Sequence, residues 1–268
     1  MRKILLSIAL VTTAFATQIE VDVTGHPESV LVNGKIAYVS NVGNELKPTE
    51  KDGDGYISLI NQKGEVVDKN FLTGLNAPKG MALIGGTLYV ADVDTVRGYN
   101  LKTKKEIFSL VFEGVNFLND ITVQNENTLL ISSTDKGKIF EINVKNKSYK
   151  AFRALPDANG LLYSNGIIYG VGHKLVTINL KNHKTTELSK KEGIFDGIQK
   201  SGDTLYFSDW VRMEKAGVIH TYNLKTKKEH DLPLETIAGP ADFWIDSKTN
   251  TIWIPKMMEG KLLISSLK

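Results

Sequence analysis

Short apolar runs recur along the chain, and each is bounded by Gly, Asn or Asp. The clearest copy spans residues 195–209: a turn at Asp196-Gly197, a strand, a second turn at 201–203 and an apolar strand ending at Asp209. Short strands separated by such turn residues predict antiparallel hairpins. The same pattern recurs six times between residues 28 and 254, which predicts a repeat architecture.

A second repeated feature is a turn after the third strand of each unit. Its Asn, or Ser in the last copy, occupies positions 61, 100, 143, 179, 223 and 266, so successive copies lie 39, 43, 36, 44 and 43 residues apart. Units of about 40 residues with four strands each are typical of β-propeller blades. Asn before Lys or Gly predicts a tight hairpin in which the Asn adopts positive φ.

The sequence therefore predicts an all-β fold, a six-bladed β-propeller of four-stranded blades. The sixth unit stops at Lys268 without a fourth strand, whereas residues 19–23 (IEVDV) form a spare alternating strand near the N-terminus. If this strand joins the last blade, it closes the ring and removes a free sheet edge. Because no segment has a long helical periodicity, we expect almost no helix.

The first residues are expected to lie outside the fold. Arg2 and Lys3 precede an apolar run, and Ala14-Phe15-Ala16 supplies the small residues of a cleavage site. We therefore predict that residues 1–16 are a signal peptide and that residues 17–268 are a single propeller domain. The protein is then expected to be periplasmic or secreted, without membrane association after cleavage, and the absence of cysteine fits a bacterial periplasm.

Charge and motifs exclude several classes of function. The 33 Lys and Arg residues nearly balance the 30 Asp and Glu residues, and many lysines fall in the repeated turns, so we expect solvated turns and no nucleic-acid-binding patch. The sequence has no Ser-His-Asp order, no Gly-x-Ser-x-Gly elbow and no phosphate-binding glycine loop.

Ligand sites of propellers usually lie in the central channel, where the inner strands start. Counting back from the second strand of each unit gives Glu28, Lys79, Asn119, Asn159, Asp196 and, with a looser fit, Asp242. Carboxylate and amide oxygens from separate blades suit Ca²⁺ or Mg²⁺, whereas the His and Cys ligands typical of zinc are absent. The alternative is that Asn159-Gly160 and Asp196-Gly197 only shape turns.

Four of these starting segments resemble a known family. Glu28-Ser29, Asn119-Asp120, Asn159-Gly160-Leu161 and Asp196-Gly197-Ile198 are similar to motifs of the gluconolactonase, regucalcin and luciferin-regenerating-enzyme family of six-bladed propellers. The blade pattern covers the whole predicted domain, and the specific part of the resemblance is these four motifs. The resemblance implies a divalent cation, usually calcium, bound directly by Glu28, Asn159 and Asp196, with Asn119 beside it in contact with the metal or a substrate.

The resemblance also implies hydrolysis of a lactone or ester, in which the metal polarises the carbonyl and Asp196 helps to activate water. Two positions depart from the family pattern: Phe117 and Ile121 stand where sugar-lactone enzymes tend to have Arg and Gly, which makes gluconolactone a poor substrate. Lys79 also points toward the mouth, where its ammonium would bind an anionic substrate or else pair with Glu28 and disfavour the metal.

Two functions therefore stay open. The first is a calcium-dependent hydrolase of a small-molecule lactone or ester, and the second is a non-catalytic propeller that binds a small ligand or a protein partner at its mouth. Two loops bear on both. Residues 43–55 end in Asp52-Gly53-Asp54-Gly55. The alternating Asp residues resemble half of a calcium loop, but no bidentate Glu follows at EF-hand spacing, which favours a plain hairpin turn. Residues 210–217 are expected to overhang the mouth of the channel.

Overall fold

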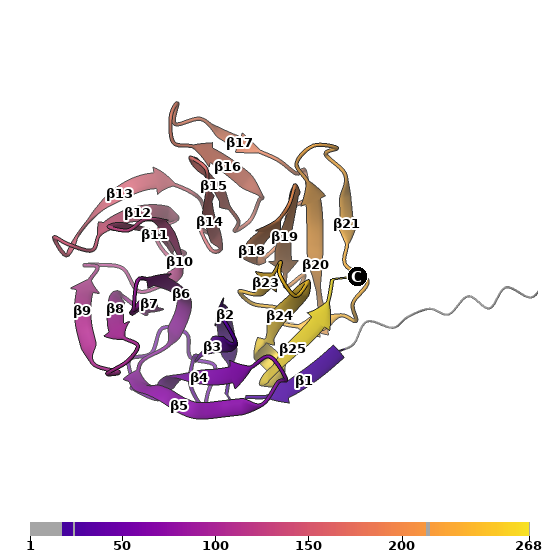
Figure 1. Ribbon diagram of the computed structural model, residues 1–268. Coiled ribbons are helices and arrows are strands. Elements are labelled where there is room, and N and C mark those ends of the chain that lie inside the picture. The colour runs from indigo at the N-terminus through magenta and orange to yellow at the C-terminus, as the bar shows by residue number, and fades with distance from the viewer. Residues whose placement is uncertain (1–17, 24, 213–214, 268) are drawn as a thin grey trace, which may run out of the picture.

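The protein is a ring of six antiparallel sheets arranged around a central axis, called the channel below (Figure 1). The computed structural model describes residues 18–23, 25–212 and 215–267. In blades 1 to 5 the strands follow sequence order from the channel outward, with the first strand of each unit innermost. The predicted six-bladed β-propeller is confirmed, and the predicted signal peptide, residues 1–16, lies outside the described residues.

The first three blades each contain four consecutive strands. Blade 1 consists of β2 (Pro27–Asn33), β3 (Ile36–Asn41), β4 (Gly55–Asn61) and β5 (Val66–Leu75). Blade 2 consists of β6 (Pro78–Ile84), β7 (Thr87–Asp92), β8 (Thr95–Asn100) and β9 (Glu106–Val111). Blade 3 consists of β10 (Leu118–Asn125), β11 (Thr128–Ser133), β12 (Lys138–Asn143) and β13 (Ser148–Ala154).

The second half of the ring is less regular. Blade 4 consists of β14 (Leu161–Ser164), β15 (Ile167–Gly170), β16 (Val176–Asn179) and β17 (Thr185–Glu187). Blade 5 consists of β18 (Phe195–Ser201), β19 (Thr204–Asp209), β20 (Lys215–Asn223) and β21 (Glu229–Asp231), with β22 (Ile237–Ala238) paired to β20. Blade 6 consists of β23 (Trp244–Asp246), β24 (Thr251–Lys256), β25 (Lys261–Ser266) and β1 (Gln18–Asp22).

The predicted closure by the N-terminal strand is confirmed. β1 pairs antiparallel with β25, and Val21 lies opposite Leu262. Ion pairs reinforce the seam: Lys261 lies 2.9 Å from Glu20, and Lys256 contacts both Glu20 and Glu259. The strand thereby covers the edge that β25 would otherwise leave unpaired.

Apolar clusters between neighbouring blades form the core of the protein. Six clusters of buried side chains each combine residues of two adjacent blades. Between blades 4 and 5, for example, Tyr169 of β15 joins Phe195 and Phe207, whose rings meet edge to face with centroids 5.0 Å apart. Each blade is thus buried on both faces, which explains why the middle of each second strand is apolar.

The repeated Asn turn is present, but the predicted positive φ of the Asn is wrong. Asn100 Oδ1 accepts hydrogen bonds from the backbone N–H groups of Lys102 and Thr103, both at 3.0 Å, and the positive φ falls on Lys104 (φ 57°). The equivalent positions in three other blades also have positive φ: Lys147, His183 and Lys227. The Asn therefore stabilises the turn by bonding the backbone ahead of it, which its short amide side chain does well.

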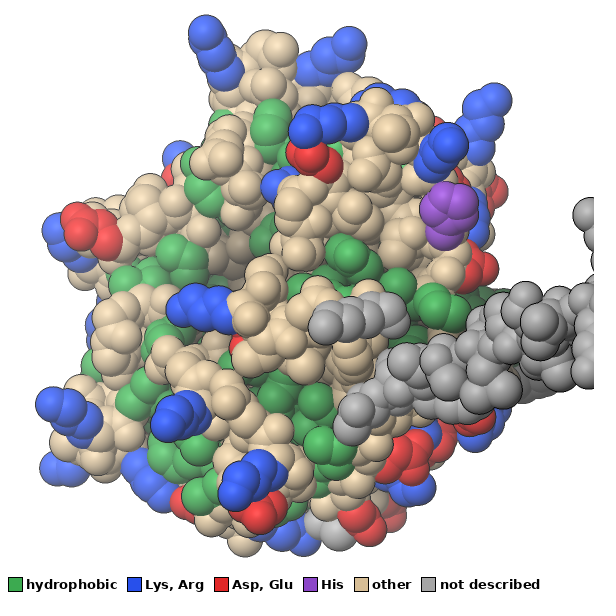
Figure 2. All heavy atoms as spheres, turned by 45° about the vertical axis from the view of Figure 1, so that its right-hand side comes forward, with side chains coloured by type: hydrophobic (Ala, Val, Ile, Leu, Met, Phe, Trp, Pro, Cys, Tyr) green, Lys and Arg blue, Asp and Glu red, His purple; other side chains and the backbone are tan. Residues whose placement is uncertain are grey.

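Helix is nearly absent from the described residues, as predicted. Their only helix is the 3₁₀ turn η1 (Met257–Glu259). None of the helical structure in the described part of the chain has the length or apolar character needed to cross a membrane. On the face shown in Figure 2, Lys and Arg side chains are scattered and do not gather into one patch.

Candidate functional site

The structure brings together the residues that the sequence placed at the channel. Glu28, Lys79, Asn119, Asn159 and Asp196 lie where the inner strands start, and all are buried except Asn159, which is half-buried. Shifts of register interrupt the pairing near the start of the inner strand in blades 1, 2, 3 and 5. Such bulges re-aim side chains out of the regular alternation, which explains how neighbouring residues reach the channel.

A second level of residues lies next along these strands. It consists of Ser29, Gly80, Asp120, Gly160, Gly197 and Asp242, with close approaches between Gly80 and Asp120, between Gly160 and Gly197, between Gly197 and Asp242, and between Asp242 and Ser29. The position predicted for Asp242 is wrong by one residue, because Asp242 bridges to Ser29 and its N–H bonds the carbonyl of Glu28 at 2.9 Å. Asp242 therefore lies at the same height in the channel as Ser29 and Asp120, one residue further along the inner strands than Glu28.

The three residues expected to bind a metal directly each present an unused oxygen. Glu28 Oε2, Asn159 Oδ1 and Asp196 Oδ1 are buried and accept no hydrogen bond, and Glu28 and Asp196 are only 3% and 6% exposed. Burying oxygens without a partner is costly, so three of them at one place fit a cation that would coordinate them. Within the described residues, no group of three or more His, Cys, Asp or Glu side chains is arranged to hold a metal, so this donor set depends on its asparagine.

The electrostatics of the channel also favour a cation. Burial, followed by the nearby charge of Asp196, raises the pKa of Glu28 well above its usual range. Burial likewise raises the pKa of both Asp120 and Asp196 to about 7 and that of Asp242 well above its usual range. Four buried carboxyl groups therefore share the channel, and a bound cation would favour their ionised forms.

Within the part of the chain that the structure describes, Lys79 places an ammonium group near these carboxyls, and it is 1% exposed. Its Nζ donates hydrogen bonds to the carbonyl oxygens of Pro48 (2.7 Å) and Ala77 (3.0 Å), and lies over the ring of Phe117, 4.8 Å from its centroid. Burial lowers the pKa of Lys79 to about 8, although nearby carboxylates, Glu28 first, oppose that shift. Two of the three ammonium protons of Lys79 go to backbone carbonyls, and no hydrogen bond joins Lys79 to Glu28 Oε2, which has no partner.

Loops cover the end of the channel at which the inner strands start. Trp210, in the loop expected to overhang the mouth, donates from Nε1 to Asp196 Oδ2 at 2.8 Å. Its ring belongs to a buried apolar cluster with Val42, Ala77 and Met257, against which Leu46 of the blade 1 insertion packs. Two loops thus form a cover over Glu28 and Asp196: one through Trp210, and the other through Pro48, which Lys79 bonds. In the sequence, only the lengths of these loops pointed to such contacts.

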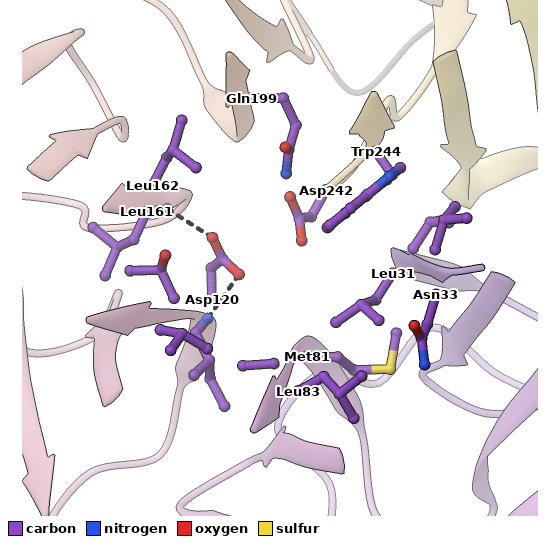
Figure 3. Close-up of a pocket in the computed structure, with 16 residues that line it drawn as sticks. Leu31, Asn33, Met81, Leu83, Asp120, Leu161, Leu162, Gln199, Asp242 and Trp244 are labelled. Carbon is purple, nitrogen blue, oxygen red and sulfur yellow. Dashed lines mark hydrogen bonds between the residues drawn. The ribbon is translucent and has the colours of Figure 1, made fainter. Parts of the chain in front are cut away.

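Beyond the Asp120–Asp242 level the channel widens into a cavity of about 310 Å³. Figure 3 shows Asp120 and Asp242 facing it from opposite sides, with Leu31, Met81 and Trp244 along the wall. Glu28, Asn159 and Asp196 do not line this cavity. The channel therefore has two parts, a covered cluster of oxygens and a larger, mostly apolar space below it.

The loop over residues 43–55 behaves as a turn. Asp54 Oδ2 accepts hydrogen bonds from the backbone N–H of Asn44 (2.8 Å) and from its side-chain amide (3.1 Å). The N–H of Asp54 in turn approaches Asp52 Oδ1 at 3.4 Å. These local hydrogen bonds agree with the interpretation of this motif as a hairpin turn.

Comparison with known proteins supports the fold alone. No model of a known protein family matches the chain, and no curated protein sequence matches it. Among solved structures, it is similar to a chain in the crystal structure of a nidogen/laminin complex, with a TM-score of 0.64 and 17% sequence identity over 78% of this chain and 80% of that chain. At this identity the similarity concerns the arrangement of strands and carries no activity with it.

Proposed function

We propose that the protein binds a divalent cation, calcium foremost, in the channel through Glu28, Asn159 and Asp196. The observation that carries this proposal is that each of these side chains has a buried oxygen without a hydrogen-bond partner. One dication would give all three oxygens a partner and would offset the repulsion between the carboxylates. The order of the donors along the chain, which resembles that of gluconolactonase-like propellers, supports the same assignment.

Calcium calorimetry on the purified protein tests this proposal. We expect about one calcium per chain, and we expect Glu28→Gln and Asp196→Asn each to weaken binding by at least about tenfold, since each removes one negative charge from the donor set. Glu126→Gln removes an exposed carboxylate of a hairpin and serves as the control, with unchanged binding. Absence of binding at millimolar calcium, or unchanged affinity in both variants while circular dichroism shows folded protein, would refute it.

The second candidate is metal-dependent hydrolysis of a lactone or ester, and Asp196 is the residue that favours it. One of its oxygens is held by the hydrogen bond from Trp210, and burial raises its pKa to about 7 while no cation is bound. A bound cation would keep Asp196 ionised, so that it could accept a proton from water. When bound, the cation would polarise the substrate carbonyl. Asn119, whose amide donates to Thr134 at 3.1 Å, and Lys79 would then lie beside the substrate.

Hydrolysis requires the cover to open. Trp210 blocks Asp196 from the side of the loops, and the ammonium of Lys79 is held by Pro48 and Ala77. Turnover of a lactone and ester panel that disappears in Asp196→Asn and requires calcium would establish the hydrolase. Calcium binding without turnover of any member of the panel would leave the first proposal standing alone and favour a non-catalytic propeller that binds a ligand or protein partner.

We also propose that the protein is exported, with residues 1–16 as a cleaved signal peptide and 17–268 as a single periplasmic or secreted domain. The basic start, short apolar run and Ala-Phe-Ala segment support this proposal. N-terminal sequencing of the protein recovered from a periplasmic fraction should begin at Thr17. Recovery of the uncleaved chain in the cytoplasm would contradict export.

A further inference from the structure

The residue that directly follows the second strand of a blade is aromatic in one blade only. From blade 1 to blade 6 these residues are Val42, Val93, Thr134, Val171, Trp210 and Met257. Four of them, from blades 1, 2, 5 and 6, belong to one buried apolar cluster, together with Ala77 and Ala241. Trp210 is 8% exposed, so blade 5 places a large, buried indole among residues of three other blades, at the end of the channel where the inner strands start.

The oxygens proposed to bind the cation are closed off from water while this indole is in place. Glu28 Oε2, Asn159 Oδ1 and Asp196 Oδ1 have almost no surface open to solvent, and none of the three residues lines the cavity further along the channel. The other oxygen of Asp196 accepts the hydrogen bond from Trp210 Nε1. A hydrated cation therefore has no open path to these oxygens, and part of the protein must move before the cation can enter or leave.

The backbone next to Trp210 is strained in the closed position. Hydrogen bonds join Trp210 N to Ile194 O (3.0 Å) and Val211 N to Asp209 Oδ1 (2.8 Å). Val211 is exposed and has a φ of 58°, a conformation that costs a β-branched residue backbone strain. Because this strain is relieved when Val211 leaves that conformation, it favours opening.

The second covering loop, the blade 1 insertion, is fastened to its surroundings by charged side chains. Lys51 pairs with Asp94 of blade 2, and the carbonyl of Pro48 accepts a hydrogen bond from the buried ammonium of Lys79. We therefore expect Trp210, and not this insertion, to move.

We propose that the indole of Trp210 is the gate of the cation site. Before a cation can enter or leave, the ring must leave its apolar cluster and the indole N–H must release Asp196 Oδ2. This inference rests on the cation site proposed above and adds how that site is reached. A gate slows entry and exit alike, so its removal raises both rate constants, whereas removal of a cation ligand mainly raises the rate constant of dissociation.

Stopped-flow mixing of the calcium-loaded, unaltered chain with excess quin-2, a fluorescent calcium chelator, gives the rate constant of dissociation. Dividing it by the Kd from calorimetry gives the rate constant of association, which we expect to lie at least about hundredfold below the diffusional ceiling of about 10⁸–10⁹ M⁻¹ s⁻¹. Association at that ceiling would overturn the gate and leave the cation site in place. Absence of calcium binding in calorimetry would overturn the cation site, and the gate with it.

Variants then locate the gate, with folding checked by circular dichroism. Trp210→Ala should raise both rate constants by at least about tenfold, and the milder Trp210→Phe, which keeps a ring but no N–H, by about threefold. Trp244→Ala enlarges the cavity further along the channel (Figure 3) and should leave both rate constants unchanged. Unchanged rate constants in the folded Trp210 variants, faster exchange in Trp244→Ala, or a rise in the rate constant of dissociation alone would overturn the proposal.

Discussion

Gly160→Ala is expected to strain the junction between blades 4 and 5, directly behind Asp196. A Cβ at position 160 would lie 2.3 Å from the carbonyl oxygen of Asp196 and 3.0 Å from both the carbonyl carbon of Gly197 and the N of Ile198. All three are backbone atoms, so no change of side-chain rotamer can relieve the overlap. The inner strands must therefore move apart.

The cost can be worked out from these contacts. Separation of the strands breaks the hydrogen bond from Gly160 N to Asp196 O, now 2.7 Å long, which costs about 1 kcal/mol. Overpacking adds about 1–3 kcal/mol, and the loss of backbone freedom in the unfolded chain offsets about 0.4–1 kcal/mol. We expect a net destabilisation of about 2 kcal/mol, or a decrease in Tm of about 4–8 °C for a domain of this size.

Thermal unfolding by circular dichroism, with a calcium titration beside it, measures both consequences. Gly86→Ala is the matched control, because no atom lies within 4 Å of its added Cβ, and its Tm should stay level or rise slightly. Gly160→Ala should also weaken calcium binding, since Asp196 moves with its own carbonyl. A Tm equal to that of the unaltered protein, together with unchanged calcium affinity, would refute the close packing of these two strands.

Three further changes have defined outcomes. Burial lowers the pKa of His220, but the hydrogen bonds that its ring N–H groups donate to Asp209 and Asp231 outweigh burial and raise that pKa overall. The stabilisation from His220 is therefore complete below about pH 6.5, the pKa in the unfolded chain, and is lost as pH rises through the folded pKa; urea unfolding in EDTA should show this loss in the unaltered protein and not in His220→Gln. Lys79→Met removes a buried positive charge near the proposed metal ligands and should tighten calcium binding by at least about threefold in calorimetry. Val21→Asp buries a charge in the closing strand and should lower the free energy of unfolding by about 3 kcal/mol or more in urea titrations.

Each of these changes has a matched comparison on the surface. His183→Gln alters an exposed turn histidine, and Lys102→Met removes an exposed turn lysine. Gln18→Asp introduces the same carboxylate at an exposed position of β1. If any of these controls reproduces the effect of its buried counterpart, the cause assigned to that effect is wrong.

The repeated parts of the fold could be predicted from the sequence because they recur with a fixed phase. The Asn turns set the blade length, and counting back from the second strand of each unit placed Glu28, Asn159 and Asp196 at the channel. The alternating strand near the N-terminus predicted the closure, since the sixth unit lacked its fourth strand. The blades were thus recognised from a repeat of about 40 residues, and the closing strand from its two-residue alternation.

The remaining features depend on contacts that have no period. Counting residues placed Asp242 at the level of Glu28, because a shift of one residue where an inner strand starts leaves no mark in the sequence. The hydrogen bond from Trp210 to Asp196 joins a variable loop to a strand of the same blade, and the bond from Lys79 to Pro48 requires the path of the blade 1 insertion. The cavity beside Asp242 is lined by residues from several inner strands, so the sequence of no single strand predicts it.

The seam between β1 and β25 also governs when the protein can finish folding. Its two strands come from opposite ends of the described chain, so this pairing has the highest loop-closure entropy of any in the ring. Blades 1 to 5 can form from consecutive strands as each is synthesised, whereas blade 6 waits for the last strand to meet the first. The N-terminal strand must therefore stay unpaired and accessible until synthesis is nearly complete, which makes the seam the step at which a chaperone or a competing strand would have most influence on the yield of folded protein.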